Sequence, residues 1–163
     1  MANVVTNSNI SCVLFDLDGT LLDTAPDMTN ALNLLLEEEN REPLTNETCR
    51  DFVSHGSVAM VNLGFGEQQN PEEFERRRLR FLYLYEQNLC LDTQLFNGMD
   101  KVLSFLEENH FPWGIVTNKP AFLTNPLLKE LGLYERATSI VSGDSLPNRK
   151  PHPEPLYLSL IHI

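Results

Sequence analysis

The sequence predicts an α/β protein with a doubly wound parallel sheet and a helical segment inserted after the first strand. Three short apolar runs support the sheet, at residues 12–15, 113–117 and 138–141. Strands that helices cover on both faces read as continuous apolar runs of this kind. Helical periodicity separates the second run from the third, and this order of elements is typical of parallel sheets. Residues 44–95, by contrast, contain helix patterns and no strand pattern.

Amphipathic patterns predict where the helices lie. We expect the first helix to begin near Thr24, which can cap it, with Asp27 at the place of a capping-box acid. Its apolar face recurs at helical spacing: Met28, Ala31, Leu32, Leu35 and Leu36. Asn70 and Pro71 start a later helix, and the arginines that follow are expected on its solvated sides. Residues 121–131 form the helix between the second and third strands.

Composition and charge restrict the partners and the compartment. The chain has 163 residues, of which 42% are hydrophobic, and a net charge of −11. No basic stretch offsets this charge, which argues against nucleic acid and anionic membranes as partners. The N-terminus lacks the basic start and apolar stretch of a secretion signal, so we expect a cytoplasmic protein. A monomer or a dimer is expected. Cys12, Cys49 and Cys90 are too widely spaced for a disulfide framework or a zinc site, and Cys12 is expected to be buried in the first strand.

Polar residues follow each of the three predicted strands, where the active sites of parallel sheets gather. Asp16 and Asp18 follow the first strand, Thr117 ends the second, and Lys150 comes shortly after the third. Each has a simpler interpretation as a turn, a helix cap or a solvated loop residue. The three sites in this order on this fold nevertheless favour chemistry.

The residue types predict transfer of a phosphoryl group. Asp16 and Asp18 point to the same side of an extended segment and repel each other, so Mg²⁺ between them would relieve the repulsion. Asp16 can then attack phosphorus, while Asp18 protonates the leaving alcohol and later deprotonates water. Thr117 offers a hydroxyl, and the helix after it is expected to present free backbone N–H groups to a phosphate. Lys150 would neutralise the phosphate oxygens.

The same residues resemble the haloacid dehalogenase-like superfamily of phosphatases. Residues 15–24 are similar to its first motif, 115–120 to its second and 150–155 to its third. The wording of the second and third motifs resembles the phosphoglycolate phosphatase branch. A close relative of that branch acts on N-acetylmuramic acid 6-phosphate, and a sugar phosphomutase would use the same core, so these alternatives stay open.

This resemblance implies a magnesium-dependent phosphatase that hydrolyses a small phosphorylated metabolite through a phospho-aspartate. The implied metal ligands are Asp16 and the backbone carbonyl of Asp18, and Asn118 is implied to join Thr117 and Lys150 in binding phosphate. Residues 24–95 would form a small helical cap on a core made of residues 1–23 and 96–163. His55 and Ser57, at a helix junction of that cap, are candidates to touch the substrate.

A fourth motif of the superfamily, an acidic loop that completes the metal shell, has no counterpart in the sequence. We therefore expect a truncated chain that lacks the remaining acidic ligand, with residues 158–163 resembling a translated sequencing adaptor and foreign to the native gene. The first strand is then expected at an open edge of the sheet, and the helix beginning near Pro153 is expected to lack the room to cover the sheet. An inactive phosphate-binding fragment is the further alternative.

Overall fold

Three parallel strands form the sheet on which the fold is built. The computed structural model describes residues 10–67 and 70–163. The strands β1 (Val13–Phe15), β4 (Trp113–Val116) and β5 (Ser139–Val141) lie in the order β1-β4-β5. Phe15 pairs with Ile115, which in turn pairs with Ile140. Apolar, helix-covered strands were predicted at these three places, and the predicted fold class is confirmed.

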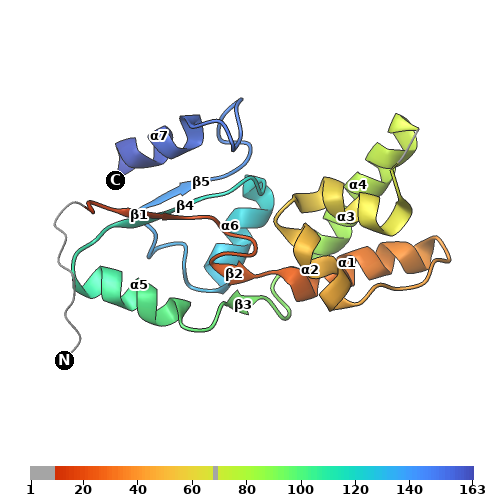
Figure 1. The fold of residues 1–163 in the computed structure, drawn as a ribbon, viewed down its shortest axis with the longest axis horizontal. Helices are drawn as coiled ribbons and strands as arrows, with labels where there is room; N and C mark the ends of the chain where they lie inside the picture. The colour runs from red at the N-terminus through yellow and green to blue at the C-terminus, as the bar shows by residue number, and fades with distance from the viewer. Residues whose placement is uncertain (1–9, 68–69) are drawn as a thin grey trace.

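Helices cover both faces of this sheet (Figure 1). The helices α5 (Met99–Glu108) and α6 (Ala121–Glu130) contribute leucines to one hydrophobic core with β1 and β4. The helix α7 (Glu154–His162) packs on the opposite face, against β4 and β5. The expectation that this last helix lacks room to cover the sheet is therefore wrong. Ser159 of α7 is fully buried and its hydroxyl lies 2.9 Å from that of Ser139.

A glycine in the central strand makes this approach possible. A Cβ atom at Gly114 would lie 3.1 Å from the hydroxyl oxygen of Ser159 and 3.0 Å from the carbonyl oxygen of Ser139. Side chains at this position would push α7 away from the sheet. On the other side of β4, β1 forms an edge of the sheet within the described residues, as expected. Cys12 lies just before β1 and is half-buried, so the prediction of a buried strand cysteine is wrong.

Four helices form a second cluster of elements with a hydrophobic core of its own. They are α1 (Ala25–Glu38), α2 (Asn46–Val53), α3 (Gly56–Phe65) and α4 (Pro71–Gln87). Figure 1 shows them together at the end of the molecule away from α5 and α7. No helix in the described residues is long and apolar enough to cross a membrane. The proposed boundaries of this unit at residues 24 and 95 stay a prediction.

Two short strands stand at the entrance and the exit of the four-helix cluster. The strand β2 (Leu22–Asp23) pairs antiparallel with β3 (Gln94–Leu95), and Leu22 lies opposite Leu95. The prediction that residues 44–95 contain no strand is wrong for β3. A two-residue strand is too short to show an alternation of apolar and polar side chains, so periodicity could not reveal it.

Asp27 in the first turn of α1 has a role that differs from the predicted one. Thr24 makes no side-chain capping bond, so the predicted capping box does not form. The carboxylate of Asp27 instead accepts bonds from the backbone N–H groups of Asp92 and Thr93, both at 2.9 Å, and from the Thr93 hydroxyl at 2.7 Å. Asp27 is buried, and these three donors come from a segment about 65 residues further along the chain and not from its own helix. The acid therefore fixes the segment between α4 and β3 to the start of α1.

We predict that Asp27→Asn lowers the free energy of unfolding by about 2–4 kcal/mol, because an amide nitrogen cannot accept the bonds that a charged oxygen accepts. Urea denaturation with linear extrapolation would measure the change. Glu37→Gln is the matched control, since Glu37 is exposed on the same helix, and it should shift stability by less than about 0.5 kcal/mol. Equal losses in the two variants would contradict the role given to Asp27.

Candidate active site

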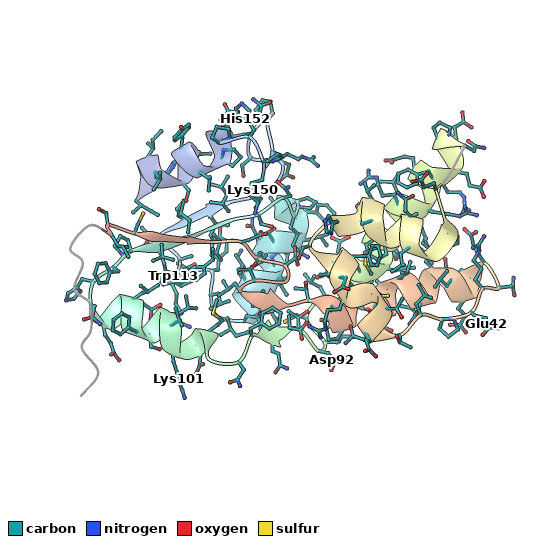
Figure 2. All side chains as sticks on the ribbon, viewed as in Figure 1. Glu42, Asp92, Lys101, Trp113, Lys150 and His152 are labelled. Atoms are coloured by element: carbon teal, nitrogen blue, oxygen red, sulfur yellow. The ribbon has the colours of Figure 1, made fainter. Side chains whose placement is uncertain are left out.

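A cavity of about 450 Å³ lies between the carboxyl ends of the strands and the four-helix cluster. All of the side chains proposed from the sequence line it: Asp16, Asp18, Thr117, Asn118, Lys150, His55 and Ser57. Figure 2 shows Lys150 at the end of the sheet nearer the four helices. The cavity is also lined by residues that sequence reasoning did not select, of which Lys119, Tyr85 and Arg78 matter most below.

Asp16 is held by one of its two carboxylate oxygens. Its Oδ1 lies 2.6 Å from the Lys150 ammonium and accepts the backbone N–H of Leu17 at 2.8 Å. The ammonium of Lys150 also donates to the carbonyl oxygen of Val116 at 2.7 Å, which anchors it to the end of β4. No hydrogen bond from the described residues reaches Oδ2 of Asp16, and the side chain is 41% exposed. One carboxylate oxygen is thus oriented and the other is accessible from the cavity.

Asp18 is paired with a lysine that sequence reasoning missed. The Lys119 ammonium donates to Oδ1 of Asp18 at 3.0 Å and to the hydroxyl of Tyr85 at 2.9 Å, and its side chain is only 4% exposed. Burial alone would lower the pKa of Lys119, but the charge of Asp18 and the two hydrogen bonds outweigh it and raise the pKa above the usual value for lysine. Burial raises the pKa of Tyr85 to about 12, against the opposing effect of Lys119. Lys119 therefore stays positively charged although its side chain is buried in the protein.

These two ion pairs correct the electrostatic argument made from the sequence. Asp16 and Asp18 were expected to need a cation between them, but each has its own lysine, Lys150 and Lys119. Repulsion between the two acids is therefore relieved by side chains of the chain itself. A metal ion is therefore not needed to relieve repulsion between the two acids, and it would bind here only through the oxygen donors that are available to it.

Hydrogen bonds fix the loop after β4 against the segment after β5, which carries Lys150. The side chain of Asn118 accepts the backbone N–H of Lys150 at 3.0 Å and donates to its carbonyl oxygen at 3.1 Å. The amide of Asn118 is thus engaged in positioning Lys150. The hydroxyl oxygen of Thr117 accepts the N–H of Lys119 at 3.1 Å, which leaves the hydroxyl hydrogen free to donate.

Gly143 is a further residue that sequence reasoning missed. Its N–H donates to the carbonyl oxygen of Lys119 at 2.8 Å, and any Cβ atom at this position would collide with the carbonyl group of Asn118. A glycine is required here because two backbones approach each other closely. The only sequence signal is a glycine two residues after a strand, which by itself indicates no more than a turn.

The N-terminus of α6 contributes less than expected. The first backbone N–H of this helix, that of Ala121, donates to Oδ1 of Asp144 at 2.8 Å. The expectation that the helix presents this N–H to a phosphate is therefore wrong. The predicted anion contacts near β4 then rest on Thr117, Lys150 and the loop between β4 and α6.

The four-helix cluster reaches the loop after β1 through one hydroxyl group. Ser54 at the end of α2 donates to the carbonyl oxygen of Asp18 at 3.1 Å. This contact needs Gly19, which has a φ of +76° and lies so close to Ser54 that any side chain would collide with it. Together with the bond between Lys119 and Tyr85 of α4, it joins the helices to the sheet directly above the cavity.

The oxygen donors at this place suit magnesium but form a small set. The candidate ligands are the carboxylate of Asp16 and the carbonyl oxygen of Asp18, and the latter can accept a second bond beside that from Ser54. Among the described residues there is no group of three or more His, Cys, Asp and Glu side chains that could hold a metal. Mg²⁺ often binds through one or two carboxylates, with waters and substrate phosphates completing its shell, so the donors present fit it.

We predict that Lys119→Met lowers the free energy of unfolding by about 3 kcal/mol, because it leaves the Asp18 carboxylate and the buried Tyr85 hydroxyl without their partner. Tyr85→Phe is the matched comparison. It removes one hydrogen bond but keeps the ring, whose centroid lies 4.4 Å from the ammonium, so it should cost only about 1 kcal/mol. Thermal or urea unfolding would measure both, and an equal cost would show that Lys119 is not held mainly by Asp18.

Comparison with known proteins agrees with this arrangement of motifs. Residues 13–162 match the family model described as haloacid dehalogenase-like hydrolase. An N-acetylmuramic acid 6-phosphate phosphatase of Pseudomonas putida is 39% identical over 150 residues, which are 92% of this chain and 67% of that protein. A phosphoglycolate phosphatase of Xanthomonas campestris pv. campestris is 43% identical over 147 residues, 90% of this chain and 66% of that protein. The chain thus spans about two thirds of the length of these relatives.

Solved structures show the same fold. A predicted phosphoglycolate phosphatase from Haemophilus somnus superposes with a TM-score of 0.79 at 26% identity, over 91% of this chain and 69% of that one. A haloacid dehalogenase-superfamily hydrolase from Geobacter sulfurreducens gives a TM-score of 0.71 at 22% identity, over 94% and 72%, and this likeness concerns the fold alone. From the family match and from relatives of this identity, we conclude that the chain belongs to the haloacid dehalogenase-like hydrolase family.

Proposed function

We propose that the protein hydrolyses a small phosphomonoester through a phospho-aspartate on Asp16. The observation that carries the proposal is the asymmetry of this carboxylate: Lys150 holds one oxygen at 2.6 Å while the other is open to the cavity. A nucleophile needs an oriented lone pair with access to the substrate, and Asp16 has both. Family membership of the chain supports the same reaction class.

The reaction would proceed in two displacements. Oδ2 of Asp16 attacks phosphorus and the bond from phosphorus to the ester oxygen breaks, while the leaving oxygen takes a proton from Asp18. A water molecule then attacks the phospho-aspartate as Asp18 takes a proton from it, and the phosphorus–Asp16 oxygen bond breaks to release inorganic phosphate. Lys119 holds Oδ1 of Asp18, so the proton would be exchanged at Oδ2.

The remaining residues would bind the phosphate. Thr117 donates its hydroxyl hydrogen, Lys150 supplies positive charge, and Asn118 acts by positioning Lys150. Asp16 and the carbonyl oxygen of Asp18 would hold Mg²⁺. The ion would supply further positive charge for the phosphate oxygens.

The substrate class follows from the relatives and the size of the cavity. The two curated relatives are named for phosphoglycolate and N-acetylmuramic acid 6-phosphate, and we propose that this protein acts on a phosphate ester of one of these two kinds. A cavity of about 450 Å³ suits a small metabolite. His55 and Ser57 line its wall on the side of the helices and are proposed to touch the part of the substrate beyond the phosphate.

A second candidate function is binding of a phosphate ester without turnover. The small set of metal donors favours it, since no three His, Cys, Asp or Glu side chains of the described residues converge to hold an ion. The two candidates differ in one measurable property. Turnover in the presence of Mg²⁺ belongs to the first, whereas the second predicts saturable phosphate binding that depends on Lys150 and no release of inorganic phosphate.

We predict that Asp16→Asn lowers the rate of phosphoglycolate hydrolysis by on the order of 10³-fold or more, because loss of a covalent nucleophile removes its whole pathway. The wild-type protein, quenched in acid during turnover, should carry a phosphoryl group that hydroxylamine releases as a hydroxamate at residue 16. Asp51→Asn, an exposed acid outside the cavity, should keep the wild-type rate. Most of the activity surviving in Asp16→Asn would end the mechanism.

Asp18→Asn distinguishes proton transfer from a structural role in the same assay. Its rate should fall by about 10²–10⁴-fold while binding of a phosphate mimic persists. A substrate with a very good leaving group needs less protonation, so it should restore the formation of the phospho-aspartate. If binding and every reaction step vanish together, Asp18 serves to hold Lys119 and has no proton to transfer.

A further inference from the structure

Four arginines follow one another closely in α4, and three of them bind acids at the C-terminal end of the neighbouring helix α1, which are its last residue and the one after it. Arg76 and Arg77 share Glu39, at 2.7 Å each, and Arg80 pairs with Glu38 at 2.5 Å. The hydrogen bond from Arg77 lowers the pKa of Glu39 in spite of its partial burial. These three arginines therefore have a structural function in packing α4 against α1.

Arg78 lies on a different face of the same helix. It lines the cavity together with Phe81, Leu82 and Tyr85, which are three, four and seven residues further along. This spacing defines one face of a helix, so Arg78 shares the face whose far end, Tyr85, reaches Lys119. The expectation that the arginines lie on solvated sides is wrong for this residue and for Arg77, which is buried.

The guanidinium of Arg78 has donors to spare. Its Nε and Nη2 atoms bind the two carboxylate oxygens of Glu75, at 2.8 and 2.6 Å, and no hydrogen bond from Nη1 reaches a described residue. Glu75 does not line the cavity, whereas Arg78 does. The wall formed by α4 thus contains a guanidinium that Glu75 neutralises but whose N–H groups are not all used, next to the apolar side chains of Phe81 and Leu82.

We propose that Arg78 is a specificity-determining residue that binds a carboxylate carried by the substrate in addition to its phosphate. This inference rests on the proposed function. Guanidinium binds carboxylate through paired N–H bonds, and Arg78 already holds the carboxylate of Glu75 in this manner. Phosphoglycolate and N-acetylmuramic acid 6-phosphate both contain a carboxylate, so either ester has a group of the kind that Arg78 would bind.

The phosphate and the carboxylate would then be bound from opposite walls. Lys150 and Thr117 belong to the sheet side, and Arg78 belongs to the helices. A ligand with both anions would bridge the two sides, while a ligand with phosphate alone would engage only the sheet side. Arg149 is the competing cation, because it also lines the cavity, but it precedes Lys150 on the same loop and would act on the phosphate end.

The test uses two ligands that cannot be hydrolysed and differ only in charge. They are 3-phosphonopropanoate, which has a carboxylate, and 3-phosphonopropanamide, its neutral amide. Isothermal titration calorimetry in the presence of Mg²⁺ gives the ratio of their dissociation constants. The wild-type protein should prefer the carboxylate by about ten- to a hundredfold, the usual range for hydrogen bonds to a charged group. Arg78→Gln should reduce the preference to about threefold or less and leave the affinity for the amide unchanged.

Matched variants make the result specific to Arg78. Arg80→Gln removes a neighbouring arginine that faces Glu38, and it should keep the wild-type ratio. Arg78→Lys keeps the positive charge but lacks the paired N–H donors of guanidinium, so it should retain part of the preference for the carboxylate ligand. Glu75→Gln removes the carboxylate that now holds Arg78, so it should increase this preference. If Arg78→Gln binds neither ligand, these two variants decide, and an unchanged ratio in both overturns the proposal.

The possible failures are distinguishable. A wild-type protein that binds both phosphonates equally, or a full preference in Arg78→Gln, overturns the role of Arg78 and leaves the proposed function standing. Loss of the preference in Arg149→Gln instead would assign the carboxylate to the other cation and also overturn it. A wild-type protein that binds neither phosphonate overturns this inference, and it contradicts the proposed function as well if it also hydrolyses neither of the two esters.

Discussion

The burial of one lysine is the constraint on which the site depends. An ammonium group removed from water is costly unless its hydrogen bonds and charge are satisfied. Lys119 is satisfied by Asp18 from the loop after β1 and by Tyr85 from α4, so three separate parts of the chain must meet at one atom. The side chain of Asp18 and the helices that roof the cavity are therefore fixed by the same requirement. A second ion pair joins the loop after β1 to the loop after β5, through Asp16 and Lys150.

Local charge differs from the charge of the whole chain. The net charge of −11 would repel an anionic metabolite, yet the cavity is lined by four cationic and only two acidic side chains among the described residues. They are Lys119, Lys150, Arg78 and Arg149, and Asp16 and Asp18. Electrostatic attraction in a cleft is set by nearby groups, because distant surface charges are screened by salt. The acidic exterior and a site for anions are thus compatible. Ion pairs with arginines neutralise some of the acids on the helices, as for Glu38 and Glu39.

The parts of the fold and site that could be predicted from the sequence are those that depend on neighbouring residues. The strands were recognised because each is a continuous apolar run, and Asp16, Thr117 and Lys150 because strand ends of a parallel sheet meet. Lys119 was missed because its partners are 101 and 34 residues away, and no local pattern announces that a lysine is buried.

Tertiary contacts explain the other differences as well. Asp27 had the spacing of a capping-box acid, but bonds to Thr93 from a distant segment prevailed over the local arrangement. Gly143 matters through a contact between two backbones, which a sequence pattern does not record. Arg78 was expected on the solvated sides of its helix with the other arginines, and choosing it over its neighbours required knowledge of where α1 lies.

The pairing of β2 with β3 has a consequence for the history of such a protein. Because Leu22 and Leu95 lie opposite each other in a two-stranded sheet of their own, the helical segment between them begins and ends at one point. The segment therefore acts as a loop whose two ends are held together. The entropic cost of closing such a loop grows only slowly with its length. A segment attached in this way can lengthen, shrink or be exchanged during evolution at little cost to the host sheet. We expect related proteins to keep the residues at the strand ends while their helical segments differ. A new substrate would then be accommodated by changing the helices over the cavity, with the reacting residues kept.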